Sequence, residues 1–412
     1  ISIINVESEP STIFVNVERS SFAHININEG WGTLFASNSN GTYFHRVLEN
    51  THRNVFGVVG VEPIRGLDGV WIANQVMNTD SMGKPGVNAL VRTVMSWDGG
   101  RTWHVLRAPT KDAEGRDLEC KDCTLNLHDR IDAGLSGHVF GVPTAPGLLM
   151  GVGSVGPHLS AYRRSKTYLS RNGGRTWVET RGIETMHEFG DHGGILVTID
   201  NEGPTNELWY STNHGATWAT YQFTDGERLR IEEVSSGITQ GGTTFTIVGR
   251  RLVSGHHGRF GDVVVVSVDF SKLHKRACQY TESDGDQSDF ELWSPGPPNA
   301  ADQACYNGQQ ASYWRRKQDA ACFVGREFEP PKTVKQTCEC TEADFECEAG
   351  FWPNDAGKCM LEGPDPYQPK DCLDGTKYIG KSGYKKRPSS VCRGGVDLEH
   401  PVERVCGLSG GA

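Results

Sequence analysis

The chain has 412 residues, among them 50 glycines, 19 prolines and 12 cysteines, and its formal net charge is −10 at pH 7. The hydrophobic fraction of 36% is enough for a folded core, and the negative charge argues against a general polyanion binder, so we expect no nucleic-acid partner. The most apolar run, residues 263–266, is much shorter than the ~20 residues of a transmembrane helix. Glycine makes up about 12% of the chain (50 of 412) against a usual ~7%, and because no collagen period is present, this excess favours turn-rich β structure.

The chain begins at Ile1 without an initiator methionine or a signal peptide, and we therefore expect it to be a piece of a longer protein. In the first two thirds, alternating apolar and polar residues predict β-strands, for example at residues 12–17, 194–199 and 244–248. Near the start, Asn40 lies in an N-x-[ST] sequon within a predicted turn, which predicts an N-linked glycan if the protein enters the secretory pathway.

Three segments of eight residues, at positions 96–103, 170–177 and 211–218, are close copies of one another. Each has Ser first, Asp or Asn third, Gly fifth and Trp last; these residues are Ser96, Asp98, Gly100 and Trp103, then Ser170, Asn172, Gly174 and Trp177, and finally Ser211, Asn213, Gly215 and Trp218. Weaker relatives lie at residues 37–44 and 267–270. The irregular spacing, roughly 40 to 75 residues, suits one β-sheet per repeat with loop insertions.

The shared residues have the chemistry of a hairpin turn that stabilises itself. The Asp or Asn side chain can accept hydrogen bonds from backbone N–H groups of the turn, and the glycine permits a positive φ. The closing Trp is large enough to anchor the packing between sheets. This motif is the Asp-box, which marks turns and not a catalytic centre. At ~40–50 residues per four-stranded repeat, residues 1–277 predict about five blades of a β-propeller.

Two other patterns resemble functional motifs without their structural context. Residues 151–156 match the dinucleotide fingerprint GxGxxG, but Pro157 follows and no helix pattern is present to bind a pyrophosphate. His187 and His192 are five positions apart, whereas histidines that bind zinc from one helix face are four apart. We therefore predict no catalytic residue, no cofactor and no metal ligand.

The cysteines divide the chain near residue 278. Cys120 and Cys123 lie before this point, and ten follow it: Cys278, Cys305, Cys322, Cys338, Cys340, Cys347, Cys359, Cys372, Cys392 and Cys406. This density predicts a disulfide-rich module at residues 278–412 in an oxidising compartment. A zinc module is the alternative, because Cys120 with Cys123 and Cys338 with Cys340 have ligand-like spacing. Most of the other cysteines are widely spaced and almost no histidine lies among them, which favours disulfides.

Together these features resemble the family of vacuolar protein sorting receptors and sortilins, including the fungal receptors that sort carboxypeptidase Y. The resemblance covers the whole chain. It is carried by the Asp-boxes, the Cys120/Cys123 insertion, residues 66–71 in an expected strand, the junction at 268–276 and the Cys-x-Cys-x6-Cys line at 338–347. It implies the later blades of a ten-bladed propeller packed against a ten-cysteine module, with the earlier blades of the same propeller before Ile1.

The resemblance also implies a function. It implies the lumenal ligand-binding part of a type I membrane receptor that binds soluble vacuolar or lysosomal hydrolases in the Golgi and delivers them to endosomes. Carboxypeptidase Y, or its propeptide, is the expected cargo. No enzymatic activity is implied, and the membrane is reached only through a transmembrane segment outside this sequence.

Some members of this family hold a peptide carboxy-terminus with an arginine that follows the first Asp-box-like turn of this half. The matching position here is Asn50, and Arg46 and Arg53 lie near it as candidate ligands for a carboxylate. The alternative function is an Asp-box glycosidase of the sialidase type. Such an enzyme needs an arginine cluster and a Tyr/Glu pair, which we do not find in the sequence.

Overall fold

The computed structural model describes most of the chain. The described residues are 1–4, 11–19, 29–84, 86–131, 141–237, 241–252, 260–281, 287–297, 305–329, 333–354, 357–361 and 363–407. Within these ranges the chain forms antiparallel β-sheets and short 3-10 turns but no α-helix, so the prediction of a mainly β fold is confirmed. The same ranges contain no helix with the length and apolar character needed to cross a membrane.

The first 181 residues contribute strands that pair in sequence order into one extended sheet. Its first part contains β1 (Ser2–Ile4), β2 (Phe14–Glu18), β3 (Gly30–Ser37), β4 (Phe44–Arg53), β5 (Val61–Pro63), β6 (Trp71–Val76), β7 (Val91–Ser96) and β8 (His104–Arg107). Its second part is the meander of β9 (Thr124–Leu127), β10 (Leu149–Gly156), β11 (Lys166–Ser170) and β12 (Val178–Arg181). The pairing of β8 with β9 joins the two parts.

Two further meanders follow. One has four strands, β13 (Thr185–Gly190), β14 (Ile195–Asp200), β15 (Glu207–Ser211) and β16 (Ala219–Gln222), and the other has three, β17 (Leu229–Ser235), β18 (Thr244–Leu252) and β19 (Phe260–Asp269). Short 3-10 turns connect some strands: η2 (Thr79–Ser81), η3 (Tyr162–Arg164), η4 (Asp191–Gly193) and, further on, η5 (Glu342–Asp344).

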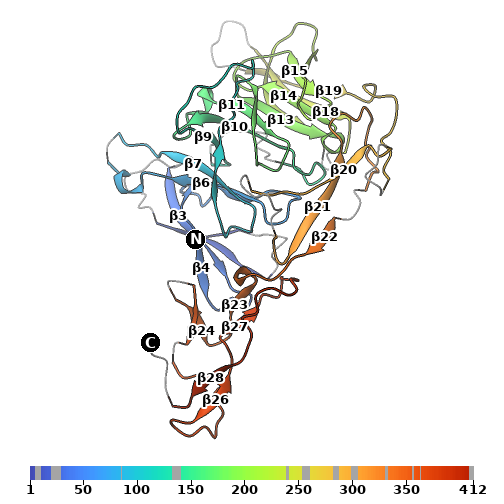
Figure 1. The fold of residues 1–412 in the computed structure, drawn as a ribbon. Coiled ribbons are helices and arrows are strands. Elements are labelled where there is room, and N and C mark those ends of the chain that lie inside the picture. The colour runs from blue at the N-terminus through green and yellow to red at the C-terminus, as the bar shows by residue number, and fades with distance from the viewer. Residues whose placement is uncertain are drawn as a thin grey trace.

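The cysteine-rich part has shorter strands. They are β20 (Phe290–Trp293), β21 (Gln309–Arg316), β22 (Val334–Thr337), β23 (Phe345–Cys347), β24 (Phe351–Pro353), β25 (Cys359–Leu361), β26 (Lys377–Gly380), β27 (Tyr384–Lys386) and β28 (Val402–Val405). β20–β22 form a three-stranded sheet, and the others pair as β23 with β27, β24 with β25 and β26 with β28. In Figure 1, β23–β28 extend from the end of the molecule near β4, opposite the end that carries β13–β19.

The structure corrects one local prediction and agrees with another. Residues 66–71 were expected in a strand, but β6 begins only at Trp71, because Gly66 and Gly69 have positive φ values of 79° and 75° and form a turn before it. The GxGxxG segment lies in β10. A Cβ on Gly153 would lie 1.9 Å from the carbonyl oxygen of Asn126 in β9, so close strand pairing and not a phosphate requires that glycine.

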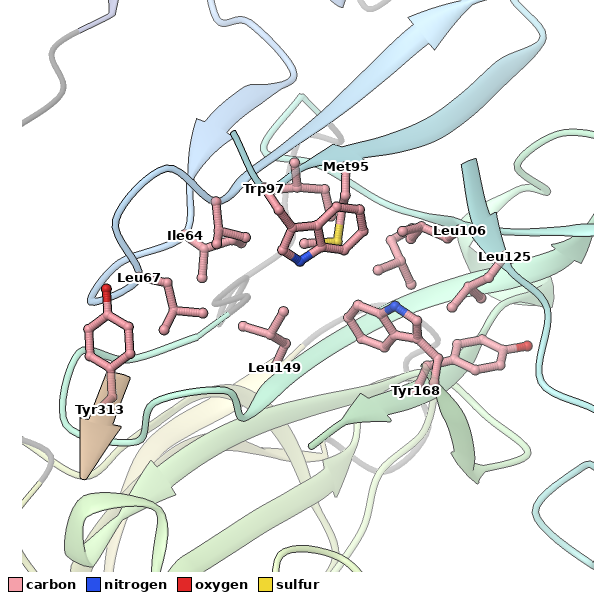
Figure 2. Packing of buried hydrophobic residues seen from close by; sticks show 13 residues of the cluster. Ile64, Leu67, Met95, Trp97, Leu106, Leu125, Leu149, Tyr168 and Tyr313 are labelled. Atoms are coloured by element: carbon pink, nitrogen blue, oxygen red, sulfur yellow. The ribbon is translucent and has the colours of Figure 1, made fainter. Parts of the chain in front are cut away.

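The hydrophobic core lies between successive sheets. Figure 2 shows the cluster that joins Trp97 and Met95 of the first part to Leu125, Leu149 and Tyr168 of the second. The same cluster includes Tyr313 of β21, from the cysteine-rich part, so that part shares the core of the sheets that precede it. A second cluster packs β13–β16 on β17–β19 and ends with Val268 and Phe270.

Candidate functional site

The three Asp-box segments make the same hydrogen bonds. In the first, Asp98 Oδ1 accepts from the Thr102 backbone N–H at 2.9 Å and from Ser96 Oγ at 2.7 Å, while Ser96 Oγ accepts from the Gly100 N–H at 2.8 Å. Asn172 and Asn213 occupy the position of Asp98 and accept from the backbone N–H four residues later at 2.8 and 2.9 Å. The turns are therefore closed by contacts within a few residues of sequence.

The fifth-position glycine of each box packs against a side chain from an earlier strand. A Cβ on Gly100 would lie 3.0 Å from Val47 of β4, one on Gly174 would lie 2.4 Å from Met95 of β7, and one on Gly215 would lie 2.3 Å from Leu169 of β11. These three glycines have φ values of 86°, 85° and 74°. Each box therefore needs glycine both for its backbone conformation and for the space at the contact between sheets.

We expect Asp98→Ala to lower the free energy of unfolding by about 1–2 kcal/mol, because three hydrogen bonds to one carboxylate are lost and the turn N–H loses its acceptor. Urea unfolding followed by tryptophan fluorescence measures this change. Asp98→Asn is the matched control, since Asn172 and Asn213 close equivalent turns, and it should stay within about 0.5 kcal/mol of wild type. An equal loss in both variants would contradict the assignment.

The weaker relative at residues 37–44 closes in a different register. Asn38, and not Ser39, accepts from the backbone N–H four residues later, that of Thr42, at 2.9 Å. Ser39 instead donates its hydroxyl to Glu346 of β23, and Lys385 of β27 donates to the exposed Asn40 at 3.2 Å. This turn therefore contacts the cysteine-rich part, and the glycan at Asn40 stays a prediction.

The cysteine-rich part covers all three Asp-box turns. Tyr306 lies against the first, where a Cβ on Gly99 would come within 2.3 Å of its ring. Arg315 donates to the Arg171 carbonyl of the second turn at 2.6 Å, and Arg316 donates to the Thr212 carbonyl of the third. Residues 306–316 therefore run along a row of turns that are far apart in sequence.

The twelve cysteines form six disulfides. They are Cys120–Cys123, Cys278–Cys322, Cys305–Cys338, Cys340–Cys392, Cys347–Cys359 and Cys372–Cys406. Since each of these sulfurs is bonded to another cysteine, none is a thiolate that could bind zinc, and the zinc alternative does not hold. Cys278 and Cys322 lie with Asp289 in a metal-like cluster, but their disulfide removes both sulfurs as ligands.

The structure does not bring Arg46, Asn50 and Arg53 together. All three lie on β4, but Arg46 and Arg53 are seven positions apart, which is roughly 20 Å along a strand. Arg46 is exposed and pairs with Glu49, and Asn50 has a left-handed backbone with φ of 54°. Arg53 is buried and donates from Nη1 to Asn16 Oδ1 at 3.0 Å, so its guanidinium is engaged inside the sheet.

A cavity of about 1,000 Å³ opens beside the first strand. It is lined by β1, β5 and the turn at residues 64–69, with Arg65 and Arg130 among its polar residues. Ile3 in its wall is 76% exposed. Phe56, which precedes the lining residue Gly57, is equally exposed. Large exposed apolar side chains beside an open cavity are typical of a surface that another protein segment covers.

Known proteins resemble this chain over both of its parts. The family profile described as Sortilin-Vps10 (sortilin, neurotensin receptor 3) matches residues 3–234, and the profile for the sortilin C-terminal part matches residues 239–406. The chain belongs to the sortilin/Vps10 family. The resemblance inferred from the Asp-boxes and cysteines is thereby confirmed.

Curated relatives of this sortilin/Vps10 family member are fungal. It is 37% identical over 393 residues to the vacuolar protein sorting/targeting protein 10 of Mycosarcoma maydis. The matched region covers 93% of this chain and 25% of that protein. The protein of the same name from Paracoccidioides brasiliensis (strain Pb03) is 32% identical over 414 residues, with coverages of 96% and 27%. The chain thus spans about a quarter of the length of these relatives. Among solved structures, TolB from Acinetobacter baumannii reaches only 10% identity and a TM-score of 0.26 over 76% of this chain and 62% of that one.

The family is one of vacuolar protein sorting receptors and not of enzymes. The six disulfides of this member fit the oxidising lumen in which such ectodomains fold. Tyr306 and Arg316, which hold the cysteine-rich part on the Asp-box turns, were not predicted from the sequence. The one available signal was the run of three adjacent charges at residues 315–317, directly after the strand-forming Tyr313 and Trp314.

One buried carboxyl group of this sorting-receptor family member titrates in an unusual range. Glu188 of β13 is 8% exposed, and burial raises the pKa of its carboxyl to about 7, against the hydrogen bonds from the Phe189 N–H and Ser236 Oγ. Because the folded-state pKa exceeds the unfolded value of about 4.5, the folded state is penalised above pH 7, and the penalty vanishes below pH 4.5.

We therefore expect Glu188→Gln to be more stable than wild type at pH 8, by on the order of 1–3 kcal/mol, and equal to it at pH 4.5. Thermal unfolding of both proteins across this pH range tests the prediction. Glu232→Gln, at an exposed position, is the control, and its stability difference from wild type should not change in this way between pH 4.5 and pH 8. A constant difference between Glu188→Gln and wild type at all pH values would contradict the assignment.

Proposed function

We propose that this chain is the lumenal ligand-binding part of a transmembrane sorting receptor, which binds soluble vacuolar or lysosomal hydrolases in the Golgi and delivers them to endosomes. The observation that carries the proposal is the family match over both parts of the chain. Because the chain spans about a quarter of its relatives, the transmembrane segment and the sorting itself belong to the rest of such a receptor.

The fold that supports this function is a propeller. We propose that residues 1–277 are about five blades of a ten-bladed β-propeller and that residues 278–412 are the ten-cysteine module packed on it. The support is the repeated contact of each Asp-box glycine with an earlier strand, in turn β4, β7 and β11, so that the contacts advance along the chain in one direction. The packing of Val268 and Phe270 on β13–β16 supports placing the boundary after β19.

The earlier blades of the same receptor are the proposed partner of the first edge of this chain. The 1,000 Å³ cavity lies beside β1, which carries the exposed Ile3 and which pairs on one side alone, with β2, among the described residues. An exposed strand edge with apolar side chains favours pairing with another strand. A preceding blade would cover both the edge and the apolar side chains.

Cargo binding is tested with the propeptide of carboxypeptidase Y. We expect the chain, joined to the upstream part of its receptor, to bind this propeptide in calorimetry at neutral pH and a scrambled propeptide not at all. A fluorogenic sialidase substrate in the same preparation should not be turned over, whereas turnover would favour the glycosidase. Failure of several vacuolar hydrolases and their propeptides to bind the folded protein would contradict the receptor proposal.

The candidate carboxylate ligands are tested by substitution, and burial decides which substitution is informative. Because Arg53 is buried, Arg53→Ala would unfold part of β4 and would not report on binding alone. Exposed Arg46→Ala is the informative variant. If a cargo carboxy-terminus binds there, Arg46→Ala and amidation of the peptide should each weaken binding, and the two losses should not add.

A further inference from the structure

A smaller cavity, of about 240 Å³, lies where the cysteine-rich part meets the first Asp-box turn. Its walls come from the hairpin of β3 and β4, from the turn at residues 99–101 and from the segments that carry Tyr306 and Arg387. The basic residues that line it are His45, Arg46, Arg101 and Arg387, and no Asp or Glu of the described chain lines it. The cavity therefore gathers cationic side chains from parts of the sequence up to 342 residues apart (387 minus 45).

Two of these arginines have no carboxylate partner within the described residues. Arg387 donates from Nε to the Phe345 carbonyl at 3.3 Å, and Arg101 lies over the ring of Tyr306 at 6.0 Å, but neither forms an ion pair. Arg46 pairs only with Glu49 on the exposed strand.

The same groups affect one another's titration. The pKa of the Arg101 guanidinium is lowered, first because the surrounding protein desolvates it and then because of the charge on Arg387. Desolvation, followed by the charges of Arg387 and Arg101, lowers the pKa of His45 to about 4. Like charges are thus held near one another without a counter-charge inside the cavity.

The nearest acidic side chains are already occupied by other donors. Asp98 closes the Asp-box turn, and Asp344 accepts from Ser390 Oγ at 2.7 Å and from the Thr341 N–H at 2.8 Å. Glu346 accepts from Ser39 and pairs with Lys385 at 3.1 Å. These carboxylates attenuate the positive field around the cavity but do not enter it.

We propose that this cavity is a binding site for a compact oxyanion, either a phosphate ester or the carboxylate of an acidic side chain. Guanidinium groups offer planar, paired donors that match both, and 240 Å³ is below the ~300–1,000 Å³ of sites for drug-sized ligands. Since Arg101 and Arg387 approach from the two sides of the junction, a bound anion would link the cysteine-rich part to the first Asp-box turn. The site does not depend on the proposed cargo function.

The test uses the full chain with two probes, inorganic phosphate and the blocked dipeptide N-acetyl-Glu-Glu amide, against chloride at matched ionic strength. Calorimetry should show at least tenfold weaker binding in the Arg101→Gln/Arg387→Gln double variant than in wild type. In thermal unfolding, a probe at about ten times its wild-type Kd should raise the wild-type Tm by roughly 1–2 °C and that of the double variant by about 0.5 °C or less.

Arg250→Gln/Arg251→Gln is the matched control, since it removes two arginines from exposed ion pairs on β18 and should bind both probes like wild type. Arg101→Lys/Arg387→Lys keeps the charges but not the paired donors, so it should bind more weakly than wild type and more tightly than the Gln double variant, which guards against misfolding of the Gln variant. Binding of phosphate alone identifies an ester ligand, and binding of the dipeptide alone identifies a carboxylate ligand. Equal affinities in wild type and the Gln double variant, or no binding of either probe beyond chloride, would overturn the proposal.

Discussion

Arg316→Ala is expected to lower the free energy of unfolding by about 3–5 kcal/mol, the largest effect of any single substitution considered for this receptor fragment. Arg316 is 2% exposed and donates to the carbonyl oxygens of Ala320 and Cys322 within its own part, and to those of Gly194 and Thr212 across the junction. Its loss leaves four carbonyl acceptors, in buried or partly buried hydrogen bonds, without this donor.

The same substitution removes a charge that a buried carboxylate needs. Asp191 is fully buried, accepts from the backbone N–H groups of Val324 and Gly325 at 3.0 and 2.8 Å, and is attracted by the charge on Arg316. Burial raises the pKa of the Asp191 carboxyl, and the backbone hydrogen bonds and the charge on Arg316 oppose this rise, so removing Arg316 takes away one of the groups that stabilise the buried carboxylate. We therefore expect residues 316–325 to detach from η4 and from the third Asp-box turn before the rest of the chain unfolds.

Urea unfolding gives the free energy, and limited proteolysis with mass spectrometry locates the detachment. Arg250→Ala is the matched control, because its ion pair with Glu232 is exposed and should contribute less than about 1 kcal/mol. Arg316→Lys should fall between the two, since an ammonium cannot reach all four carbonyls. A loss below about 0.5 kcal/mol for Arg316→Ala would show that water replaces the guanidinium, and that the junction does not depend on it.

The second large effect is expected from the double variant Cys340→Ser/Cys392→Ser, which should lose about 4 kcal/mol. The disulfide joins residues 52 positions apart, so its removal returns a large conformational freedom to the unfolded chain. The native side also loses packing, since both cysteines are buried in a small cluster with Phe345. Strands of three or four residues provide little other apolar burial in this region.

The chain offers its own control for this prediction. Cys120 and Cys123 are three positions apart in a largely exposed loop, and Cys120→Ser/Cys123→Ser should lose only about 1–2 kcal/mol by the same relation. Thermal unfolding under non-reducing conditions compares the two variants, and neither leaves an unpaired thiol. Equal losses of stability would mean that the Cys340–Cys392 disulfide does not stabilise the chain by closing a long loop.

The spatial neighbours of the candidate binding residues could not be predicted from the sequence. Arg46, Asn50 and Arg53 were chosen because they follow an Asp-box-like turn, but the neighbours of each side chain depend on which sheets stack beside β4. Arg53 is buried on Asn16 of β2, and Arg46 faces the junction with the cysteine-rich part. Asn16 lies 37 residues from Arg53, and Arg387 in the cavity wall lies 341 residues from Arg46 (387 minus 46), so a local pattern carries no information about either neighbour.

The sequence by itself determined the Asp-box turns, the mainly β fold and the family. The reason is that the turn hydrogen bonds join residues two to four positions apart, and the cysteine spacing is a property of the chain alone. Only the tertiary structure decided which cysteines pair, that Arg316 crosses the junction, and that Arg101 and Arg387 share one cavity. Those contacts join segments tens to hundreds of residues apart, and their geometry is set by how the sheets and the cysteine-rich part pack together, which no short stretch of sequence specifies.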